Sequence, residues 1–171
     1  MFSLDDLFRA VPSYQVAGRL GIDVVAWLSP IDEAMRETGA RLYPLRDLAW
    51  PLNLNAVFRK PAPASFSRSA LRDHVLVVRV YGEFRSTDEL ALSHIDREHD
   101  RWSIELDLIR FEDLNIDPAP RNLWLVMSIE VGNYPLRSLA LRFCGRCRDF
   151  QGNEKAMQEP VAPSQAVEFV D

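Results

Sequence analysis

The chain has 171 residues, of which 47% are hydrophobic and 26% charged, and its net formal charge is −5. This length and composition predict one globular domain that buries its own core. Two cysteines are too few for a disulfide scaffold, and no apolar run reaches the roughly 20 residues of a membrane span, so a disulfide-stapled domain and a membrane-spanning helix are both excluded.

Helix and strand signals alternate in the N-terminal third. A helix is predicted to start at Ser3, which can cap a first turn that contains two aspartates. The β-branched and aromatic run IDVVAWL, over 22–28, predicts a strand. A second helix is predicted between Ser29 and Gly39, because Pro30 fits the first helical position and glycine ends helices. The opening residues lack the basic region of a secretory signal, so we expect a cytoplasmic protein.

Strand signals dominate from residue 74 onward. Residues 74–84 form an apolar run typical of a buried strand, whereas residues 102–111 alternate between apolar and polar and predict a strand with one buried face. Residues 86–100 fit either a helix with a capping box or an edge strand. Two apolar runs flank the sequence GNYP, so residues 123–143 predict a hairpin.

These elements together predict an α+β fold. We expect a mostly antiparallel sheet of about four to five strands, with short N-terminal helices covering one face. Residues 1–150 are assigned to this single globular domain. Residues 151–171 are rich in Gln, Pro, Glu and Ala, which predicts a loosely ordered acidic tail.

Several catalytic and nucleotide-binding motifs are absent from the sequence. It contains no Walker-type phosphate loop, no dinucleotide-binding glycine pattern, no H-E-x-x-H and no G-x-S-x-G. Its seven glycines are dispersed, whereas a phosphate loop needs them clustered so that backbone amides can approach the anion. We therefore expect no cofactor and favour a protein that is not an enzyme.

Both cysteines lie in the segment RFCGRCRDF, as Cys144 and Cys147. Too few residues follow them for a thioredoxin-like fold. A structural zinc site needs four ligands, and His94 and His99 are candidates for the other two. A metal-binding protein or enzyme with a site built from these four residues is therefore one alternative. Two reduced thiols at the end of a strand are the simpler interpretation, and we adopt it.

Two segments carry basic residues without any acid, 58–72 and 137–148. The first combines four cationic side chains with Phe58 and Phe66, which are residue types that contact phosphates and stack on bases. A nucleic-acid-associated protein is thus a second alternative. The acidic balance of the whole chain argues against it.

Residues 83–117 carry eleven acids against four arginines, a net charge of −7. An acidic surface speeds association with a cationic partner and fixes its orientation. The sequence therefore predicts a non-enzymatic protein-binding module of the antagonist or adaptor type, comparable to immunity proteins or phage-encoded inhibitors, that masks a basic surface of another protein. No membrane partner is expected.

The predicted partner-binding residues are acids of this block: Asp96, Glu98, Asp100, Glu105, Asp107, Glu112 and Asp113. In the alternating segment 102–111, large apolar side chains lie on one face of the predicted strand. Glu105 and Asp107 must then point to the other face. We expect that second face to be open to solvent, because carboxylates buried without a cationic partner are costly.

Overall fold

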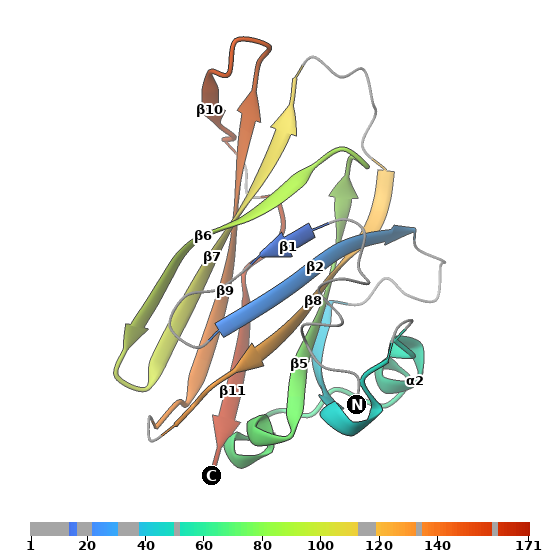
Figure 1. Ribbon diagram of the computed structural model, residues 1–171, viewed down its shortest axis with the longest axis vertical. Coiled ribbons are helices and arrows are strands. Elements are labelled where there is room, and N and C mark those ends of the chain that lie inside the picture. The colour runs from blue at the N-terminus through green and yellow to red at the C-terminus, as the bar shows by residue number, and fades with distance from the viewer. Residues whose placement is uncertain are drawn as a thin grey trace.

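The computed structural model describes residues 14–16, 22–30, 38–49, 52–112, 119–132, 135–158 and 161–171. They form two β-sheets that pack face to face, and strand β2 (Ile22–Pro30) of one sheet passes in front of β9 (Ser138–Arg148) of the other in Figure 1. The predicted α+β fold is wrong, because the molecule is a β-sandwich. None of the described helices is long and apolar enough to cross a membrane.

The first sheet has the strand order β1-β2-β8-β5-β3 and is antiparallel throughout. Its other strands are β1 (Tyr14–Val16), β8 (Ala119–Ile129), β5 (His74–Phe84) and β3 (Gly39–Pro44). Ser29 and Pro30 belong to β2 and Gly39 to β3, so the ends of the predicted second helix are strand residues. The predicted helix from Ser3 lies outside the described residues.

The second sheet has the strand order β4-β11-β9-β7-β6, with β10 pairing β9 beside this path. Its other strands are β4 (Phe66–Ser67), β11 (Gln165–Val170), β7 (Arg101–Phe111), β6 (Glu89–Glu98) and β10 (Glu154–Ala156). Strands β7 and β9 run parallel, whereas β6 and β7 form an antiparallel hairpin. Of the two structures predicted for residues 86–100, the edge strand is therefore the one observed.

The main core lies between the two sheets. Alternate residues of β7 point into it, since Trp102, Ile104, Leu106 and Leu108 are at most 2% exposed, as the alternation predicts. Strand β8 lies in the first sheet and β9 in the second, so the hairpin predicted over 123–143 does not form. The connection between these two strands instead crosses from one sheet to the other.

A second apolar cluster covers the outer face of the first sheet. It contains Trp27, Tyr43 and Trp124 from the strands, and α2 (Leu54–Phe58) packs Leu54 into it. Strands β2, β5 and β8 are therefore buried on both faces, which explains why their sequences are apolar runs without alternation. Apart from two short 3₁₀ turns, Leu45–Asp47 and Arg68–Arg72, α2 is the one helix among the described residues.

Residues 151–171, predicted to be a loosely ordered tail, contain two strands. Strand β11 lies between β9 and β4 in the second sheet, and its Val167 and Phe169 are 3% and 4% exposed. Met157 and Val161 pack over Gly145 of β9 so closely that a Cβ at Gly145 would overlap them. The described parts of this segment thus belong to the sandwich rather than to a separate tail.

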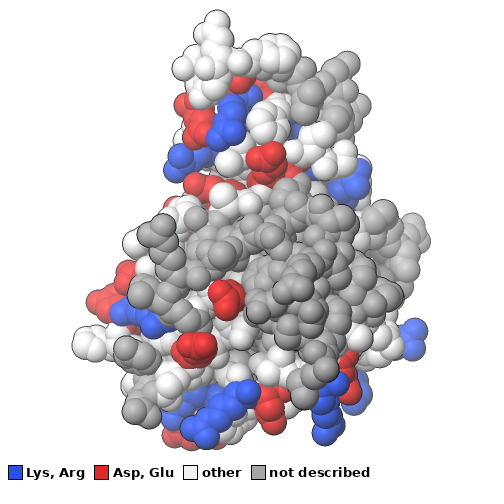
Figure 2. Space-filling view, in the orientation of Figure 1, with Lys and Arg blue, Asp and Glu red and all other residues white. Residues whose placement is uncertain are grey.

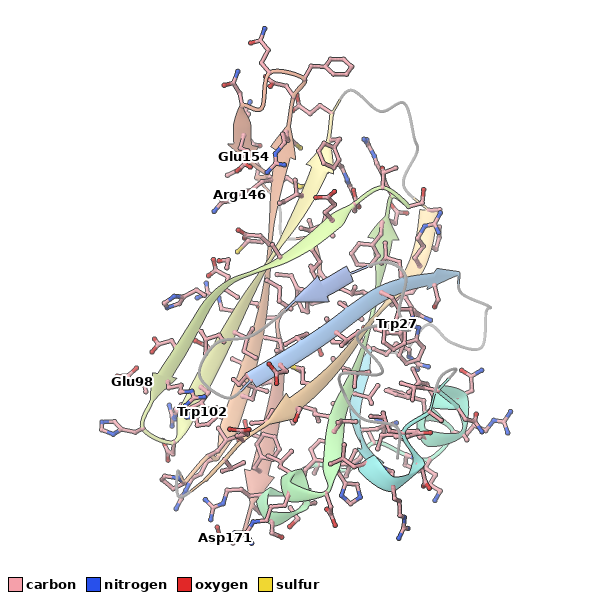
Figure 3. All side chains as sticks on the ribbon, in the orientation of Figure 1. Trp27, Glu98, Trp102, Arg146, Glu154 and Asp171 are labelled. Carbon is pink, nitrogen blue, oxygen red and sulfur yellow. The ribbon has the colours of Figure 1, made fainter. Side chains whose placement is uncertain are left out.

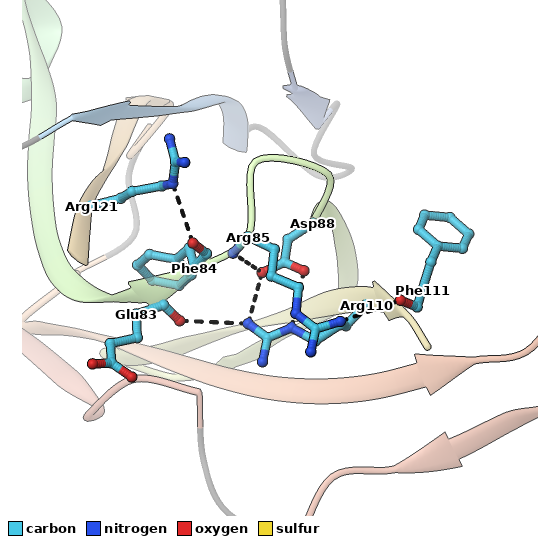
Figure 4. Close-up of polar contacts among 7 residues, drawn as sticks. All are labelled: Glu83, Phe84, Arg85, Asp88, Arg110, Phe111 and Arg121. Atoms are coloured by element: carbon cyan, nitrogen blue, oxygen red, sulfur yellow. Dashed lines mark hydrogen bonds and ion pairs between the residues drawn. The ribbon is translucent and has the colours of Figure 1, made fainter. Parts of the chain in front are cut away.

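A buried ion pair holds the corner where the chain passes from β5 to β6 (Figure 4). The Asp88 carboxylate, 1% exposed, accepts hydrogen bonds from Nε and Nη2 of Arg110 at 3.1 and 2.8 Å. It also accepts one from the backbone N–H of Arg85 at 2.8 Å. These contacts join the β5–β6 turn to β7, and so tie the first sheet to the second.

Candidate functional site: the charged outer face of the second sheet

The outer face of the second sheet is built by alternate residues of β6, β7 and β9. The strand register places Glu105 between His94 and Arg142, and it places Asp107 beside Cys144 on β9. Glu105 accepts a hydrogen bond from Oγ of Ser93 at 3.2 Å. As predicted, the carboxylates of β7 therefore point away from the core.

Asp107 is not open to solvent, however. It is 7% exposed, and its Oδ2 lies 3.3 Å from Nη2 of Arg146 on β9. Arg146 also contacts Glu154 of β10, and so does Nε of Arg148 at 3.1 Å. These two arginines lower the pKa of the Glu154 carboxyl through their hydrogen bonds. The cation that pairs with Asp107 comes from the parallel neighbouring strand β9, so Asp107 belongs to an internal charge network.

The seven predicted partner-binding residues do not form one patch. Asp96 and Glu98 are exposed near the end of β6, and Asp100 lies in the following turn, 3.7 Å from Nε of Arg137. Glu112 follows the opposite end of the 11-residue β7, and Asp113 lies outside the described residues. Figure 3 shows Glu98 beside the β6–β7 turn, far from Arg146 and Glu154.

The two cysteines lie on opposite faces of β9. Cys144 points outward, toward Glu105 and Asp107. Cys147 is three residues further along the same continuous strand, so it points to the opposite, inner face, where it interacts electrostatically with the inward-facing Arg110. His94 is exposed on β6, two strands away from β9, and His99 lies in the β6–β7 turn with a φ of 52°. The structure therefore does not bring Cys144, Cys147, His94 and His99 together as ligands of one metal.

A different group, Glu105, Asp107 and Cys144, places one ligand atom from each residue within 4.8 Å of the others. Burial, followed by the nearby charges of Glu105 and Asp107, raises the pKa of the Cys144 thiol. A metal ligand must be the thiolate, and Asp107 already has a cationic partner in Arg146. The chemistry of this group therefore favours a protonated, unreactive thiol.

We predict that Cys144 reacts slowly with iodoacetamide and that Glu105→Gln accelerates the reaction. Removing the carboxylate charge lowers the pKa of the thiol, so more thiolate is present at pH 8, and the rate should rise by roughly two- to fivefold. The rate is measured by mass spectrometry in a Cys147→Ser background. Glu168→Gln, an exposed change on β11, serves as the control. An unchanged rate in Glu105→Gln would show that Glu105 has no influence on the thiol.

Part of the two basic segments is used for contacts within the molecule. Phe66 is 8% exposed and packs on Phe169, so it cannot stack on a base. Arg68 is paired with Asp171, and Arg137 lies near Asp100. Acidic and basic side chains are interspersed on the face shown in Figure 2. This arrangement does not favour a nucleic-acid interface over residues 58–72 and 137–148.

No protein family matches the chain, and no curated protein or solved structure matches it either.

Sequence reasoning missed the partners that organise the charged face. Arg146 and Glu154 belong to segments considered for other roles, and only the parallel pairing of β7 with β9 aligns Asp107 with Cys144 and brings Arg146 close. The spacing of 39 residues between Asp107 and Arg146 carries no signal in a single sequence. The alternation within β9, by contrast, already implies that Cys144 and Cys147 face opposite ways if the segment is a strand.

Proposed function

We propose that the chain is a non-enzymatic protein-binding module of the antagonist or adaptor type, which acts in the cytoplasm and masks a basic surface of another protein. The observation that supports this most directly is the β6–β7 hairpin. Asp96 and Glu98 are both exposed there, and neither makes an ion pair with any residue that the structure describes. They are exposed acids of this block that lie on one strand, two residues apart.

Strand β6 lies at the edge of the second sheet, and its irregular pairing favours binding of a partner through side chains rather than through backbone pairing with another strand. A register shift between Leu92 and His94 interrupts the pairing of β6 with β7, and irregularities of this kind discourage edge-to-edge association with other strands. Arg97 lies over the ring of its cross-strand partner Trp102, with its guanidinium carbon 4.4 Å from the ring centroid, and this contact joins the two strands of the hairpin. Arg97 lies on the same face as Trp102, toward the core. Asp96 and Glu98, the residues before and after it, therefore both point to the outer face of the second sheet.

Neutralising these two acids tests the proposal. Asp96→Asn with Glu98→Gln keeps the shape of both side chains and avoids placing a cation opposite Arg101, the cross-strand partner of Glu98. Glu130→Gln with Glu168→Gln removes two exposed charges elsewhere and is the matched control. Because exposed charges contribute about 1 kcal/mol or less to stability, both variants should stay folded.

The expected result is specific to the hairpin. A protein retained from host extract by the wild-type chain and by the control variant should be lost with Asp96→Asn/Glu98→Gln. With that partner purified, the association rate of the hairpin variant should fall by roughly three- to tenfold at low salt, and the difference should shrink as salt screens the charges. Equal losses in both variants, or full retention by the hairpin variant, would contradict the proposal.

A further inference from the structure

The segment between β10 and β11, residues 157–164, has described residues that contact both sheets, and we call this segment the strap. Val161 places its Cγ1 against Gly145 of β9, and its carbonyl oxygen would lie 3.7 Å from a Cβ built on Gly82 of β5. Val161 packs against the main core, and Ala162 is 6% exposed within it. Because Gly82 and Gly145 lie near the last residues of their strands, the strap covers one end of the core.

Met157 anchors the strap to β9. Its backbone N–H donates to the carbonyl oxygen of Gly145 at 2.9 Å, and its Sδ lies so close to Gly145 that a Cβ there would overlap the sulfur. The missing side chain of Gly145 therefore makes the seat for this sulfur. Leu108, which pairs with Gly145 across β7 and β9, is 2% exposed, so the seat borders the apolar core.

The Met157 side chain is half-buried, so a small oxidant in the solvent can reach it. Met127 on β8, the other methionine in the part of the chain that the structure describes, is 0% exposed. Oxidation of a thioether gives a sulfoxide, whose oxygen is polar and costly to bury without a hydrogen-bond donor. The seat at Gly145 leaves no room for an added atom, so the oxidised side chain must leave it.

We propose that Met157 is a reversible oxidation site for peroxides, and that its sulfoxide releases the strap from β9. A lone pair of Sδ attacks one oxygen of hydrogen peroxide, so that an S–O bond forms, the O–O bond breaks and water leaves. The sulfur loses two electrons, which the peroxide gains. A methionine sulfoxide reductase reverses the step with a dithiol, which becomes a disulfide while the oxygen leaves as water. This site is separate from the acidic hairpin and needs no partner protein.

Peptide mapping by mass spectrometry tests whether Met157 is the reactive methionine. The chain carries Cys144→Ser and Cys147→Ser, which remove the competing thiols, and it is treated with hydrogen peroxide. Met157 should be oxidised at least tenfold faster than Met127, because Met127 is closed to solvent. Equal rates, or a slower rate at Met157, would overturn the proposal.

Hydrogen exchange of the same chain tests whether the strap is released. After oxidation the Met157 amide should exchange at least tenfold faster, because its hydrogen bond to Gly145 is lost, whereas the amides of β8 should stay protected. Met157→Leu is the matched control, since leucine keeps an apolar side chain that peroxide does not oxidise. Its exchange should be the same before and after peroxide.

Reduction tests whether the release is reversible. Methionine sulfoxide reductases for both sulfoxide epimers, with dithiothreitol as the reductant, should restore the exchange of the unoxidised chain. A sulfoxide at Met157 without faster exchange, or no recovery after reduction, would contradict the proposal. So would equally faster exchange in peroxide-treated Met157→Leu. Loss of protection in β8 as well would show that oxidation unfolds the whole domain instead of releasing the strap.

Discussion

Removal of residues 154–171 is expected to unfold the protein at room temperature. Strand β11 lies inside the second sheet, with β9 on one side and β4 on the other. Its Val167 and Phe169 are buried, Ala162 before it is 6% exposed, and the Phe169 ring centroid lies 6.3 Å from that of Phe66. Truncation would therefore expose part of the main core and leave backbone groups of β9 unpaired. The measurement is the near-UV and far-UV circular dichroism of the truncated chain.

A single substitution isolates the contribution of the core contact. Phe169→Ala should lower the free energy of unfolding by about 3–5 kcal/mol, as expected when a buried aromatic side chain leaves a cavity. Val170→Ala is the matched control, because Val170 is the next residue on the same strand and is 53% exposed; its effect should be within about 0.5 kcal/mol. Urea unfolding measures both. A Phe169→Ala effect as small as that of the control would place β11 outside the cooperative core.

The contrast between composition and structure in this segment has a physical origin. Over 151–171 the average composition is polar, and averaging hides one amphipathic strand. In QAVEFV, residues 165–170, every second residue is buried or half-buried, so the alternation needed for a strand is present. A six-residue alternation becomes a strand only because β9 and β4 provide partners, and β4 lies about a hundred residues earlier in the chain. Such pairing cannot be deduced from local pattern.

The same reasoning explains which parts of the sheets could be predicted. The strands near 22–28, 74–84 and 102–111 were predictable, since burial on one or two faces leaves a readable pattern in each. The division of the strands into two sheets was not predictable. Strands β8 and β9 follow one another closely in the chain and yet lie in different sheets. A hairpin and a connection that crosses between sheets have similar flanking sequences, so the sequence could not distinguish them. Most strands were therefore predicted correctly, but they were wrongly placed in a single sheet covered by helices.

The candidate site shows a similar division. The outward direction of Glu105 and Asp107 follows from alternation, and the structure agrees with it. The environments of the acids do not follow from alternation. Asp107 makes an ion pair with Arg146 across the parallel strands, whereas Asp96 and Glu98 make no ion pair with a described residue. Whether an acid is available to a partner thus depends on which strand lies beside it. The sequence alone predicts only which face of the sheet each side chain points to.

Replacement of Asp88 by Asn is expected to lower the free energy of unfolding by about 3–5 kcal/mol, because it leaves the Arg110 cation buried without a counter-charge. Arg110 has a side-chain exposure of 14%, and its hydrogen bonds to Asp88 raise the pKa of its guanidinium. In a chain of this length, a loss of that size lowers Tm by roughly 10 °C. Asn keeps an oxygen for the Arg85 N–H, so the change removes the charge rather than the acceptor of the turn.

A double-mutant cycle decides whether the ion pair itself holds the β5–β6 corner. Arg110→Met removes the cation and keeps much of the apolar stem, so Asp88→Asn/Arg110→Met should be less destabilised than the sum of the two single variants, by at least about 1 kcal/mol. Reversal of the exposed pair Arg68 and Asp171 is the control, because it should change stability by less than about 1 kcal/mol. Additive single effects at Asp88 and Arg110 would show that the two residues act independently. The corner would then be held by the hydrogen bonds of the turn, between Arg85 and Asp88, rather than by its link to β7.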